Sequence, residues 1–532
     1  MLRLHQIRLT LSQAAQGEPN CRALAAAFLK VAEADVLSAA VFRRSVDARD
    51  KRDVHFSLSL DVALFSPKAE QALIRRFQPN QAVLIDAPDE RDVFSMPAAP
   101  YGTGRPRPVV IGAGPAGLFC ALGLAVRGAK PIVLERGKRV DERTKDVTAL
   151  MRDGVLNPES NVLFGEGGAG AYSDGKLTCG LKDPLIRTVL NTLAACGAPP
   201  EILIDAKPHI GTDFLRWVLK TLRGKLLTLG AELLFERRAT GLAIANGRVT
   251  AVLAGDERFG TDTVFLAAGH SARDVYAWLD AAGVPLQSKP FAVGVRIEHP
   301  QVMIDQAQYG GAAGHPALPP AEYKLNVKTP DSRGVYTFCM CPGGEVMNAS
   351  SEPGRLNLNG MSRNARDGRN ANAALLVGVH PSDFGGPLDG IAFQRKIEEA
   401  AFAVGGGYLA PCQRVEDFLR GRPSQTFGVV QPSYRPGVVP GDIARVLPDF
   451  VTGNLRRALP ILGKRLAGFD LPDALLTAPE TRSSSPVRIL RDGRRESPVR
   501  GLYPLGEGAG YTGGIISSAV DGLKAALDER TL

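Results

Sequence analysis

Cysteine is scarce in this chain, and long apolar runs are missing from it. The seven cysteines have neither the even count nor the regular spacing of a disulfide framework, and no Cys/His cluster has the spacing of a zinc site. We therefore expect a protein of a reducing compartment, the cytoplasm, without a bound metal. No apolar run approaches the ~20 residues of a membrane-spanning helix. The alternating N-terminal segment MLRLHQIRLTLSQ lacks the apolar core of a signal peptide, so we expect no membrane partner.

A strong charge of one sign is also absent. The chain has 532 residues with 64 Lys and Arg against 55 Asp and Glu, and the resulting net charge of +9 is spread along the sequence. The densest basic run, 42–52, is interleaved with Asp47 and Asp50, as in a solvated loop. Charge alone therefore gives no reason to expect nucleic-acid binding. The length is typical of roughly two to four domains.

The chain divides by pattern and composition into five parts. Residues 1–95 predict the order strand, helix, strand, strand, helix, strand, which is that of a small ferredoxin-like α+β domain. A Pro- and Gly-rich linker follows at 96–107. Residues 108–275 predict an α/β nucleotide-binding domain, and 276–495 an inserted α+β substrate domain. Residues 496–532 return to the nucleotide-binding domain with a strand, a turn and a helix.

Two local signals in the nucleotide-binding part are clear. Residues 212–230 predict a helix with Thr212 or Asp213 as N-cap and Gly230 as its stop. The pair Asn246–Gly247 between apolar runs predicts a hairpin turn.

The segment VVIGAGPAGLFCALGLAVRGAKPIVLERG, residues 109–137, has the pattern of a dinucleotide-binding strand, turn and helix. Gly112 permits the tight turn, Gly114 lets the backbone approach a pyrophosphate, and Gly117 allows close packing of helix and strand. The N–H groups and dipole at the helix N-terminus favour phosphates. Glu135, at the end of the next strand, suits a ribose diol and disfavours a 2′-phosphate, so NADP is not expected here.

Two further segments match the glycine pattern without its context. Residues 165–170 are not followed by a helix, and 508–513 leave no room for a second βαβ unit before the sequence ends. We therefore expect one Rossmann-type half. Because a catalytic NAD domain usually needs a second mononucleotide half, the sequence favours FAD over NAD.

The segment 109–137 resembles the FAD-binding entry of the glutathione-reductase-fold flavoproteins. TVFLAAG (263–269) and YPLGEGAGYTGGIISSAVDGLKAA (503–526) resemble later FAD elements of that fold. More narrowly, NVLFGEGGAGAYSDGKL (161–177) and TFCMCPGGEVMNASSE (337–352) resemble an uncharacterised group of FAD-dependent dehydrogenases, or NAD(P)/FAD-dependent oxidoreductases, that carry a small N-terminal α/β domain. The fold that this implies is a Rossmann-like FAD-binding domain of glutathione-reductase type with an inserted substrate domain.

The same resemblance implies non-covalently bound FAD, two-electron chemistry and a small-molecule substrate. Glu507 would contact ribityl hydroxyls in place of the commoner Asp. The helix that begins at Gly513–Gly514 would point its positive N-terminus at the flavin. The expected FAD contacts are Gly112, Ala113, Gly114, Pro115, Ala116, Gly117, Glu135, Arg136, Arg143, Gly167, Gly168, Ala268, Gly269, Gly506, Glu507, Gly513, Gly514 and Ile515.

Polar residues among the glycines of 164–177 are candidates for catalysis, because bare backbone admits a flat isoalloxazine while side chains contact the substrate. A tight loop held by Asp and Ser turn bonds is the other interpretation. A histidine between Pro and Ile is more often structural, but it can act as an acid or base, and a tyrosine in the C-terminal turn can donate a proton. The predicted catalytic residues are Glu166, Tyr172, Lys176, His209 and Tyr511.

The cysteines invite a disulfide-reductase interpretation that their spacing does not favour. Cys339 and Cys341 stand at i, i+2 in a predicted strand, where a bridge is strained, so we interpret them as small core residues. Cys120 is expected to be buried, and the thiol of Cys179 to lie near the flavin.

The sequence therefore predicts an FAD-dependent oxidoreductase of dehydrogenase type, with NAD(P)H as an optional transient electron donor. A basic segment before an apolar strand either receives an anionic substrate or NAD(P)H, or is solvated; it holds Arg363, Arg366 and Arg369. One alternative is a flavin monooxygenase. The other is a flavin-containing RNA-associated or scaffolding protein, which predicts salt-sensitive RNA binding and little turnover.

Overall fold

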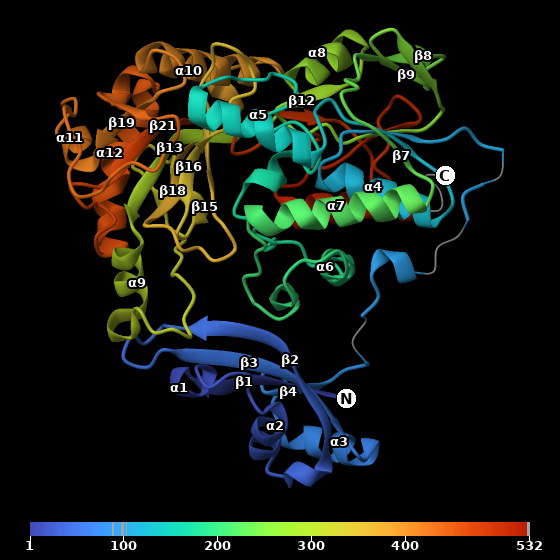
Figure 1. Cartoon of the computed structure of the whole chain (residues 1–532), viewed down its shortest axis with the longest axis vertical. Coiled ribbons are helices and arrows are strands. Elements are labelled where there is room, and N and C mark those ends of the chain that lie inside the picture. The colour runs from blue at the N-terminus through green and yellow to red at the C-terminus, as the bar shows by residue number, and fades with distance from the viewer. Residues whose placement is uncertain (88–89, 97–99, 103, 529–532) are drawn as a thin grey trace.

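The computed structural model describes residues 1–87, 90–96, 100–102 and 104–528 (Figure 1). Over these residues the chain is a mixed α/β structure whose largest sheets have four, five and seven strands. Figure 1 shows the four-stranded N-terminal sheet at one end of the longest axis, below the two larger sheets. Of the predicted linker 96–107, residues 97–99 and 103 lie outside the described residues, as do 529–532 of the predicted C-terminal part.

The N-terminal sheet is antiparallel, with strand order β2-β3-β1-β4. Its strands and main helices follow one another in the predicted order. Alternate side chains of its strands, such as Leu2, Leu4 and Leu60, are buried in one core with residues of the helices, as the alternating sequence predicted. The backbone N–H of Arg44 donates to the carbonyl of Ile204 at 2.7 Å and ties this sheet to the rest. The elements are β1 (Leu2–Thr10), α1 (Leu11–Ala14), α2 (Cys21–Leu29), β2 (Val36–Asp47), β3 (His55–Leu64), α3 (Pro67–Leu73) and β4 (Ala82–Leu84).

The five-stranded sheet is parallel, with strand order β23-β11-β5-β6-β7. Its strands are β5 (Val109–Ile111), β6 (Ile132–Leu134), β7 (Glu232–Leu234), β11 (Val264–Leu266) and β23 (Leu502–Pro504). A smaller antiparallel sheet holds β8 (Gly241–Ala245), β9 (Arg248–Ala254) and β10 (Glu257–Gly260). The helices are α4 (Pro115–Val126), α5 (Val140–Asp153), α6 (Leu185–Ala195), α7 (Thr212–Thr228), α8 (Arg273–Ala281) and α13 (Ile515–Leu527).

The predicted helix and the predicted hairpin turn are both present in this part. The helix predicted at 212–230 is α7, and Gly230 follows it with φ +84. The N-cap prediction was wrong by one residue: Gly211 is the N-cap, and the Thr212 hydroxyl instead donates to the carbonyl of Ala171. Asn246 and its following glycine both have positive φ and join β8 to β9, as a two-residue hairpin turn requires.

Helix α4 is apolar on every side because it is buried on every side. It packs against the parallel sheet on one face and against α13 on another, so its buried residues include Leu118, Phe119 and Leu122. The C-terminal helix therefore holds the helix of the dinucleotide segment in place.

The seven-stranded sheet lies between β11 and β23 in sequence and has the order β14-β15-β18-β13-β21-β19-β20. Its central strands β13 and β18 are buried on both faces, and they carry buried polar side chains such as Arg296 and Asn372 among their apolar residues. The strands are β13 (Phe291–Pro300), β14 (Asn326–Lys328), β15 (Gly334–Cys341), β18 (Asn370–Val379), β19 (Ala410–Arg414), β20 (Val438–Pro440) and β21 (Leu475–Glu480). Two-stranded ladders add β12 (Leu286–Ser288) with β22 (Val487–Ile489), and β16 (Glu345–Asn348) with β17 (Leu358–Met361). The helices of this part are α9 (Gln301–Tyr309), α10 (Asp389–Gly405), α11 (Val415–Leu419) and α12 (Asp449–Arg465).

Candidate functional site

A large cavity lies where the carboxyl ends of the parallel strands face the seven-stranded sheet. Its volume is about 740 Å³, within the range of sites that hold small molecules and cofactors. The lining comes from the turn after β5, the end of β6, the segments 168–180 and 267–272, strands β15 and β21, and the start of α13. Ligands of open α/β sheets bind at this edge.

The turn between β5 and α4 presents bare backbone to the cavity. Gly112 has φ +101, and a Cβ there would lie 2.5 Å from the carbonyl oxygen of Ala267. A Cβ on Gly117 would lie 1.9 Å from the carbonyl oxygen of Gly112, so α4 packs this close to the turn only without a side chain there. Gly114 is the N-cap of α4, and it lines the cavity with Pro115. The N-terminus of α4 thus stands at the cavity wall, as a phosphate site requires.

Glu135 directly follows strand β6 and lines the cavity. Its carboxylate also holds the neighbouring backbone in place. Its Oε2 accepts the N–H of Ala113 at 2.8 Å, and its Oε1 accepts the N–H groups of Gly137 and Gly165, both at 2.9 Å. The same carboxylate therefore ties the dinucleotide turn to two later segments, a role that the sequence did not suggest. Because a carboxylate oxygen accepts more than one hydrogen bond, a ribose diol still has acceptors here.

We expect Glu135→Ala to lower the free energy of unfolding by about 3 kcal/mol, because three buried N–H groups lose their acceptor at a cost of about 1–3 kcal/mol each before the site relaxes. Urea unfolding followed by circular dichroism measures this change. Glu142→Ala, at an exposed position of α5, is the control and should leave the midpoint unchanged. Equal midpoints for the two variants would contradict the bracing role.

Arg136 also lines the cavity, but its charge is already matched. Its guanidinium pairs with Glu159 at 3.0 Å and Asp274 at 2.8 Å, and it stacks 4.3 Å from the ring centre of Phe164. A cofactor would therefore meet a fixed planar surface rather than a free cation.

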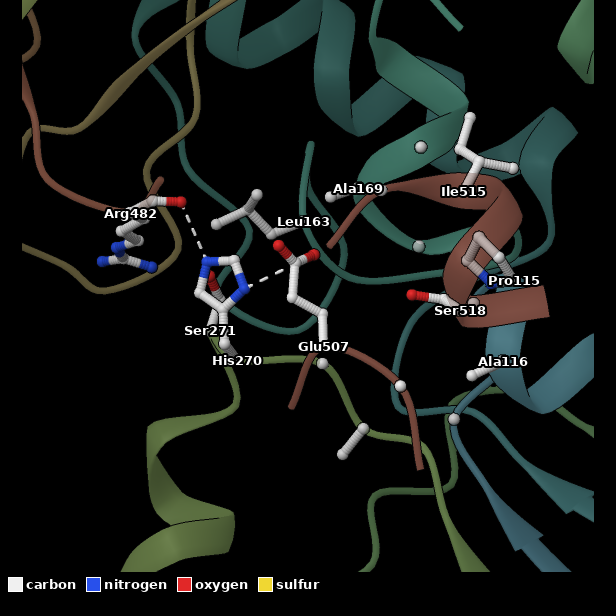
Figure 2. A pocket seen from close by; sticks show the side chains of 18 of the residues that line it. Pro115, Ala116, Leu163, Ala169, His270, Ser271, Arg482, Glu507, Ile515 and Ser518 are labelled. Carbon is white, nitrogen blue, oxygen red and sulfur yellow. Dashed lines mark hydrogen bonds and ion pairs between the residues drawn. The ribbon is translucent and has the colours of Figure 1, made fainter. Parts of the chain in front are cut away.

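The start of α13 lines the cavity beside the start of α4 (Figure 2). Gly514 is its N-cap, without a side-chain hydrogen bond, and Gly513, Ile515 and Ser518 line the cavity beside it. The first N–H groups of a helix have no intrahelical acceptor, and the helix dipole makes this end positive. The arrangement suits an electron-rich group of a bound ligand.

His270 is a cavity residue that the sequence analysis missed. Its Nε2 donates to the carbonyl of Arg482 at 2.9 Å, and its Nδ1 lies 3.7 Å from the carboxylate of Glu507 (Figure 2). Both side chains line the cavity. The available signal was position alone, because His270 directly follows the predicted FAD element 263–269.

The cavity gathers most of the predicted FAD contacts from distant parts of the sequence. The exceptions are packed behind the wall: Ala113, Gly117, Arg143 and Gly167. A Cβ on Gly167 would lie 2.3 Å from Leu219, and its N–H donates to the carbonyl of Ala113 at 2.8 Å. The three small residues among them, Ala113, Gly117 and Gly167, shape the wall without lining it.

Arg143 requires a correction, because it holds a loop and does not face the cavity. It is fully buried, and its guanidinium donates to four backbone carbonyls, those of Asn161 (2.8 Å), Val162 (2.8 Å), Glu166 (2.6 Å) and Gly168 (2.9 Å). Its donors are thus occupied by the protein itself. The residue positions the glycine-rich segment that lines the cavity.

Glu166 and Tyr172 are likewise structural rather than cavity residues. Glu166 is buried, pairs with Arg223 and accepts the N–H of Val140 at 2.8 Å; burial raises its pKa. The Tyr172 hydroxyl is 2.8 Å from the hydroxyl of Thr144, and its ring lies under the guanidinium of Arg143. Neither residue lines the cavity, so the prediction of catalytic roles for them is not supported by their positions.

His209 and Tyr511 also lie outside the lining. The His209 Nε2 donates to the carbonyl of Asn364 at 2.9 Å, and burial together with the Arg366 charge lowers its pKa, so the ring is neutral and structural. Tyr511 is 39% exposed, and its ring lies between the guanidinium groups of Arg488 and Arg491. The C-terminal turn carries it away from the cavity.

Lys176 is the predicted catalytic residue that does line the cavity. Its ammonium binds the carboxylate of Asp174 and the carbonyl of Met340. Arg366 binds the same carboxylate in a bidentate pair, at 2.5 and 3.0 Å, so the pKa of Asp174 is lowered by Lys176 and Arg366 despite burial. Arg366 is thereby committed to Asp174 rather than to an anionic substrate. Arg363 and Arg369 do not line the cavity.

The far end of the cavity is formed by the seven-stranded sheet and carries two reactive groups that sequence reasoning did not place there. Glu480, at the end of β21, pairs with the buried Arg296 at 3.0 Å; burial nevertheless raises the pKa of Glu480 to about 7. Cys339 lines the cavity too, which corrects its interpretation as a core residue, whereas Cys341 is fully buried. Cys120 is buried as predicted, and Cys179 lines the cavity.

The described residues hold no group of His, Cys, Asp and Glu side chains able to bind a metal ion. Among the same residues, no helix is both long enough and apolar enough to cross a bilayer. All seven cysteines are described, and each is a free thiol.

Comparison with known proteins identifies the class of this site. Residues 290–483 match the family described as FAD-dependent protein, C-terminal domain-like, and residues 1–63 match a domain of unknown function (DUF8436). An uncharacterized protein of Clostridium beijerinckii is 45% identical over 503 residues, which are 94% of this chain and 93% of the clostridial protein. The chain belongs to the same family as this clostridial protein, and its residues 290–483 form an FAD-dependent protein C-terminal-like domain. Its cofactor is FAD, and the bare turn, the two helix N-termini and the cavity fit that molecule.

Solved structures of similar outline have low identity to this chain. A point mutant of E. coli quinol fumarate reductase FrdA is 13% identical and matches with a TM-score of 0.36, covering 80% of this chain and 70% of that one. The L-amino acid deaminase from Proteus vulgaris is 12% identical with a TM-score of 0.32, covering 81% of this chain and 95% of that one. These likenesses support no conclusion about the reaction.

Proposed function

We propose that this protein is an FAD-dependent oxidoreductase of dehydrogenase type, which moves two electrons between a small-molecule substrate and non-covalently bound FAD. The observation that carries the proposal is the continuity of one cavity. It runs from the phosphate-binding turn at Gly112–Gly114, past Glu507 and the α13 N-terminus, to a polar end at Lys176 and Glu480. FAD, when bound, accepts or donates two electrons at its ring.

The chain's own groups have separate tasks in this proposal. The α4 N-terminus holds the pyrophosphate, Glu135 accepts from the ribose, and Glu507, beside His270, accepts from the ribityl hydroxyls. The positive N-terminus of α13 stabilises negative charge on the reduced ring. Glu480, whose pKa burial raises to about 7, is suited to give or take a substrate proton.

The proposal also assigns the domain boundaries and the cellular compartment of the protein. Residues 108–275 and 496–532 form the FAD-binding domain of glutathione-reductase type, and 276–495 form the inserted substrate domain. The free state of the cysteines supports a reducing compartment, the cytoplasm. NAD(P)H is retained as a transient donor that visits the cavity and does not replace FAD.

The test is an absorption spectrum of the purified protein, repeated anaerobically with NADH and then NADPH. We expect a flavin spectrum, flavin released by acid or heat, and uptake of two electrons per flavin on titration with dithionite. If one nucleotide rapidly bleaches the flavin absorption, that nucleotide is the electron donor. If neither nucleotide changes the flavin absorption, the substrate itself donates the electrons. A protein that neither contains nor takes up FAD would overturn the proposal.

The same preparation separates the alternatives. Oxygen uptake coupled to a hydroxylated product indicates a monooxygenase. Salt-sensitive RNA binding with a flavin that no substrate reduces indicates an RNA-associated protein.

A further inference from the structure

Cys339 stands at an irregular point of the strand that faces the substrate end of the cavity. Strand β15 pairs regularly with β18 up to Phe338, where the ladder is interrupted and resumes at Cys341 opposite Asn372. Cys339 has φ +43, in the left-handed region that a non-glycine residue rarely adopts. Backbone strain of this kind concentrates at functional sites. The irregularity turns Cys339 toward the cavity, which it lines.

Two cations bracket this bend. The Lys176 ammonium binds the carbonyl of Met340, the residue between the two cysteines. The Arg296 guanidinium donates to the carbonyl of Cys339 at 3.1 Å and lies 3.8 Å from the Cys341 sulfur. The titratable groups around Cys339 are Cys341 on its own strand, Lys176 and Asp174 on the glycine-rich segment, Arg296 on β13 and Glu480 on β21.

The two thiols differ in the way that an attacking and a resolving thiol differ. The neighbouring Cys341 thiol, followed by Lys176 and Arg296, lowers the pKa of Cys339 to about 6, although burial and Asp174 oppose this. The interaction with the Cys339 sulfur, followed by burial, raises the pKa of Cys341 well above the usual value of a thiol. These shifts favour the thiolate at Cys339 and the protonated thiol at Cys341.

The bend also changes the geometry that argued against a bridge. In a regular strand, thiols at i and i+2 are too far apart to bond without strain. Here the Cys341 thiol donates to the carbonyl of Cys339 at 3.3 Å, so its side chain turns back along the chain toward its partner. The interrupted ladder removes the regular spacing on which the earlier interpretation depended.

We propose that Cys339 and Cys341 form a redox-active dithiol at the substrate end of the FAD cavity, and that it takes a low-molecular-weight disulfide as substrate. The proposal rests on the proposed function only for regeneration, in which two electrons and two protons return the oxidised pair to the dithiol. The exchange itself needs nothing beyond the two thiols and the disulfide.

The exchange has two balanced steps. The Cys339 thiolate attacks one sulfur of the disulfide R–S–S–R; a protein–substrate S–S bond forms, the R–S–S–R bond breaks, and R–S⁻ leaves. Cys341 then gives its proton to the first R–S⁻ and attacks the Cys339 sulfur, which forms the 339–341 disulfide and releases the second R–S⁻, which takes a proton from solvent. One dithiol and one substrate disulfide give one protein disulfide and two thiols.

The test uses the full-length flavoprotein, reduced, desalted and mixed anaerobically with dithiodipyridine, whose thione product is measured by absorbance. We expect a fast phase that releases two thiones per protein and leaves a 339–341 disulfide in the peptide map. Cys341→Ser should release one thione and keep a pyridyl adduct on Cys339, and Cys339→Ser should lose the fast phase. Cys21→Ser, at the start of helix α2 in the N-terminal part and outside the cavity lining, is the matched control and should keep it.

The electrostatic cause is tested by the pH dependence of iodoacetamide labelling at Cys339, read by mass spectrometry. The rate should be half-maximal near pH 6 and fall about ten-fold for each pH unit below that, because only the thiolate reacts. Lys176→Met should move the half-maximal pH upward by about one unit, since a cation that favours the thiolate is lost. Cys179, which lines the same cavity, provides the internal comparison in every sample.

The outcomes separate this proposal from the proposed function. If Cys339 reacts no faster than Cys179, or if wild-type protein keeps its pyridyl adduct without forming the 339–341 disulfide, the dithiol is overturned while the flavin readout stands. If the protein lacks flavin but shows the two-thione phase, the proposed function fails and the dithiol stands.

Discussion

Gly117→Ala should weaken FAD binding by at least about a hundred-fold, the equivalent of about 2.7 kcal/mol. The added Cβ would lie 1.9 Å from the carbonyl oxygen of Gly112 and 3.4 Å from a methyl group of Val110. Neither neighbour is the end of a flexible chain, so α4 must move away from the turn. This displaces the helix N-terminus from the phosphate site. Overpacking of this kind also destabilises a fold by about 1–3 kcal/mol.

The matched control is Gly224→Ala, the same substitution inside another helix. Gly224 lies in α7, and nothing stands within 4 Å of the Cβ it would gain. Alanine is the better helix former by about 1 kcal/mol, so this variant should be slightly more stable and keep its FAD. Flavin retained after gel filtration and urea unfolding measure both effects. Full flavin content in Gly117→Ala would show that the turn tolerates a side chain and would remove the support for a phosphate site there.

Arg143→Lys should lower the free energy of unfolding by about 4 kcal/mol, because lysine lacks the planar set of donors that serves four buried carbonyls. The residue is fully buried, so water does not replace the lost bonds. Release of the carbonyls of Glu166 and Gly168 would loosen the segment that lines the middle of the cavity. Weaker FAD binding should accompany the loss of stability.

Arg139→Lys is the control for this prediction, because Arg139 is exposed at the start of the same helix α5. Its free energy of unfolding should change by less than about 0.5 kcal/mol. Differential scanning calorimetry of both variants, with and without added FAD, gives the comparison. If Arg143→Lys unfolds like Arg139→Lys, the guanidinium contacts do not hold the loop.

The candidate site shows where sequence reasoning succeeds. The turn at Gly112–Gly117 and the start of α13 were predicted because their signals are local: glycine spacing, an adjoining apolar strand and a following helix. The same holds for α7 and for the Asn246–Gly247 turn. Each pattern is complete within about thirty residues, the length of a βαβ unit.

The site predictions that the structure does not support have one physical cause. Glu166, Tyr172 and Arg143 look like polar site residues in a glycine-rich segment, but their partners lie on other elements that turn them into the protein. Cys339 was placed in a core because a regular strand was assumed, and only the interrupted pairing with β18 turns it outward. Position along the chain does not say which way a side chain points.

By itself, the sequence determined that this chain folds around a dinucleotide turn and binds FAD, because a bare turn and a helix N-terminus are local requirements of phosphate binding. Only the tertiary structure decided which groups line the polar end of the cavity. Lys176, Cys339 and Glu480 come from three segments far apart in the chain. They meet because the seven-stranded sheet closes over the carboxyl ends of the parallel strands, and contacts between distant strands leave no local pattern.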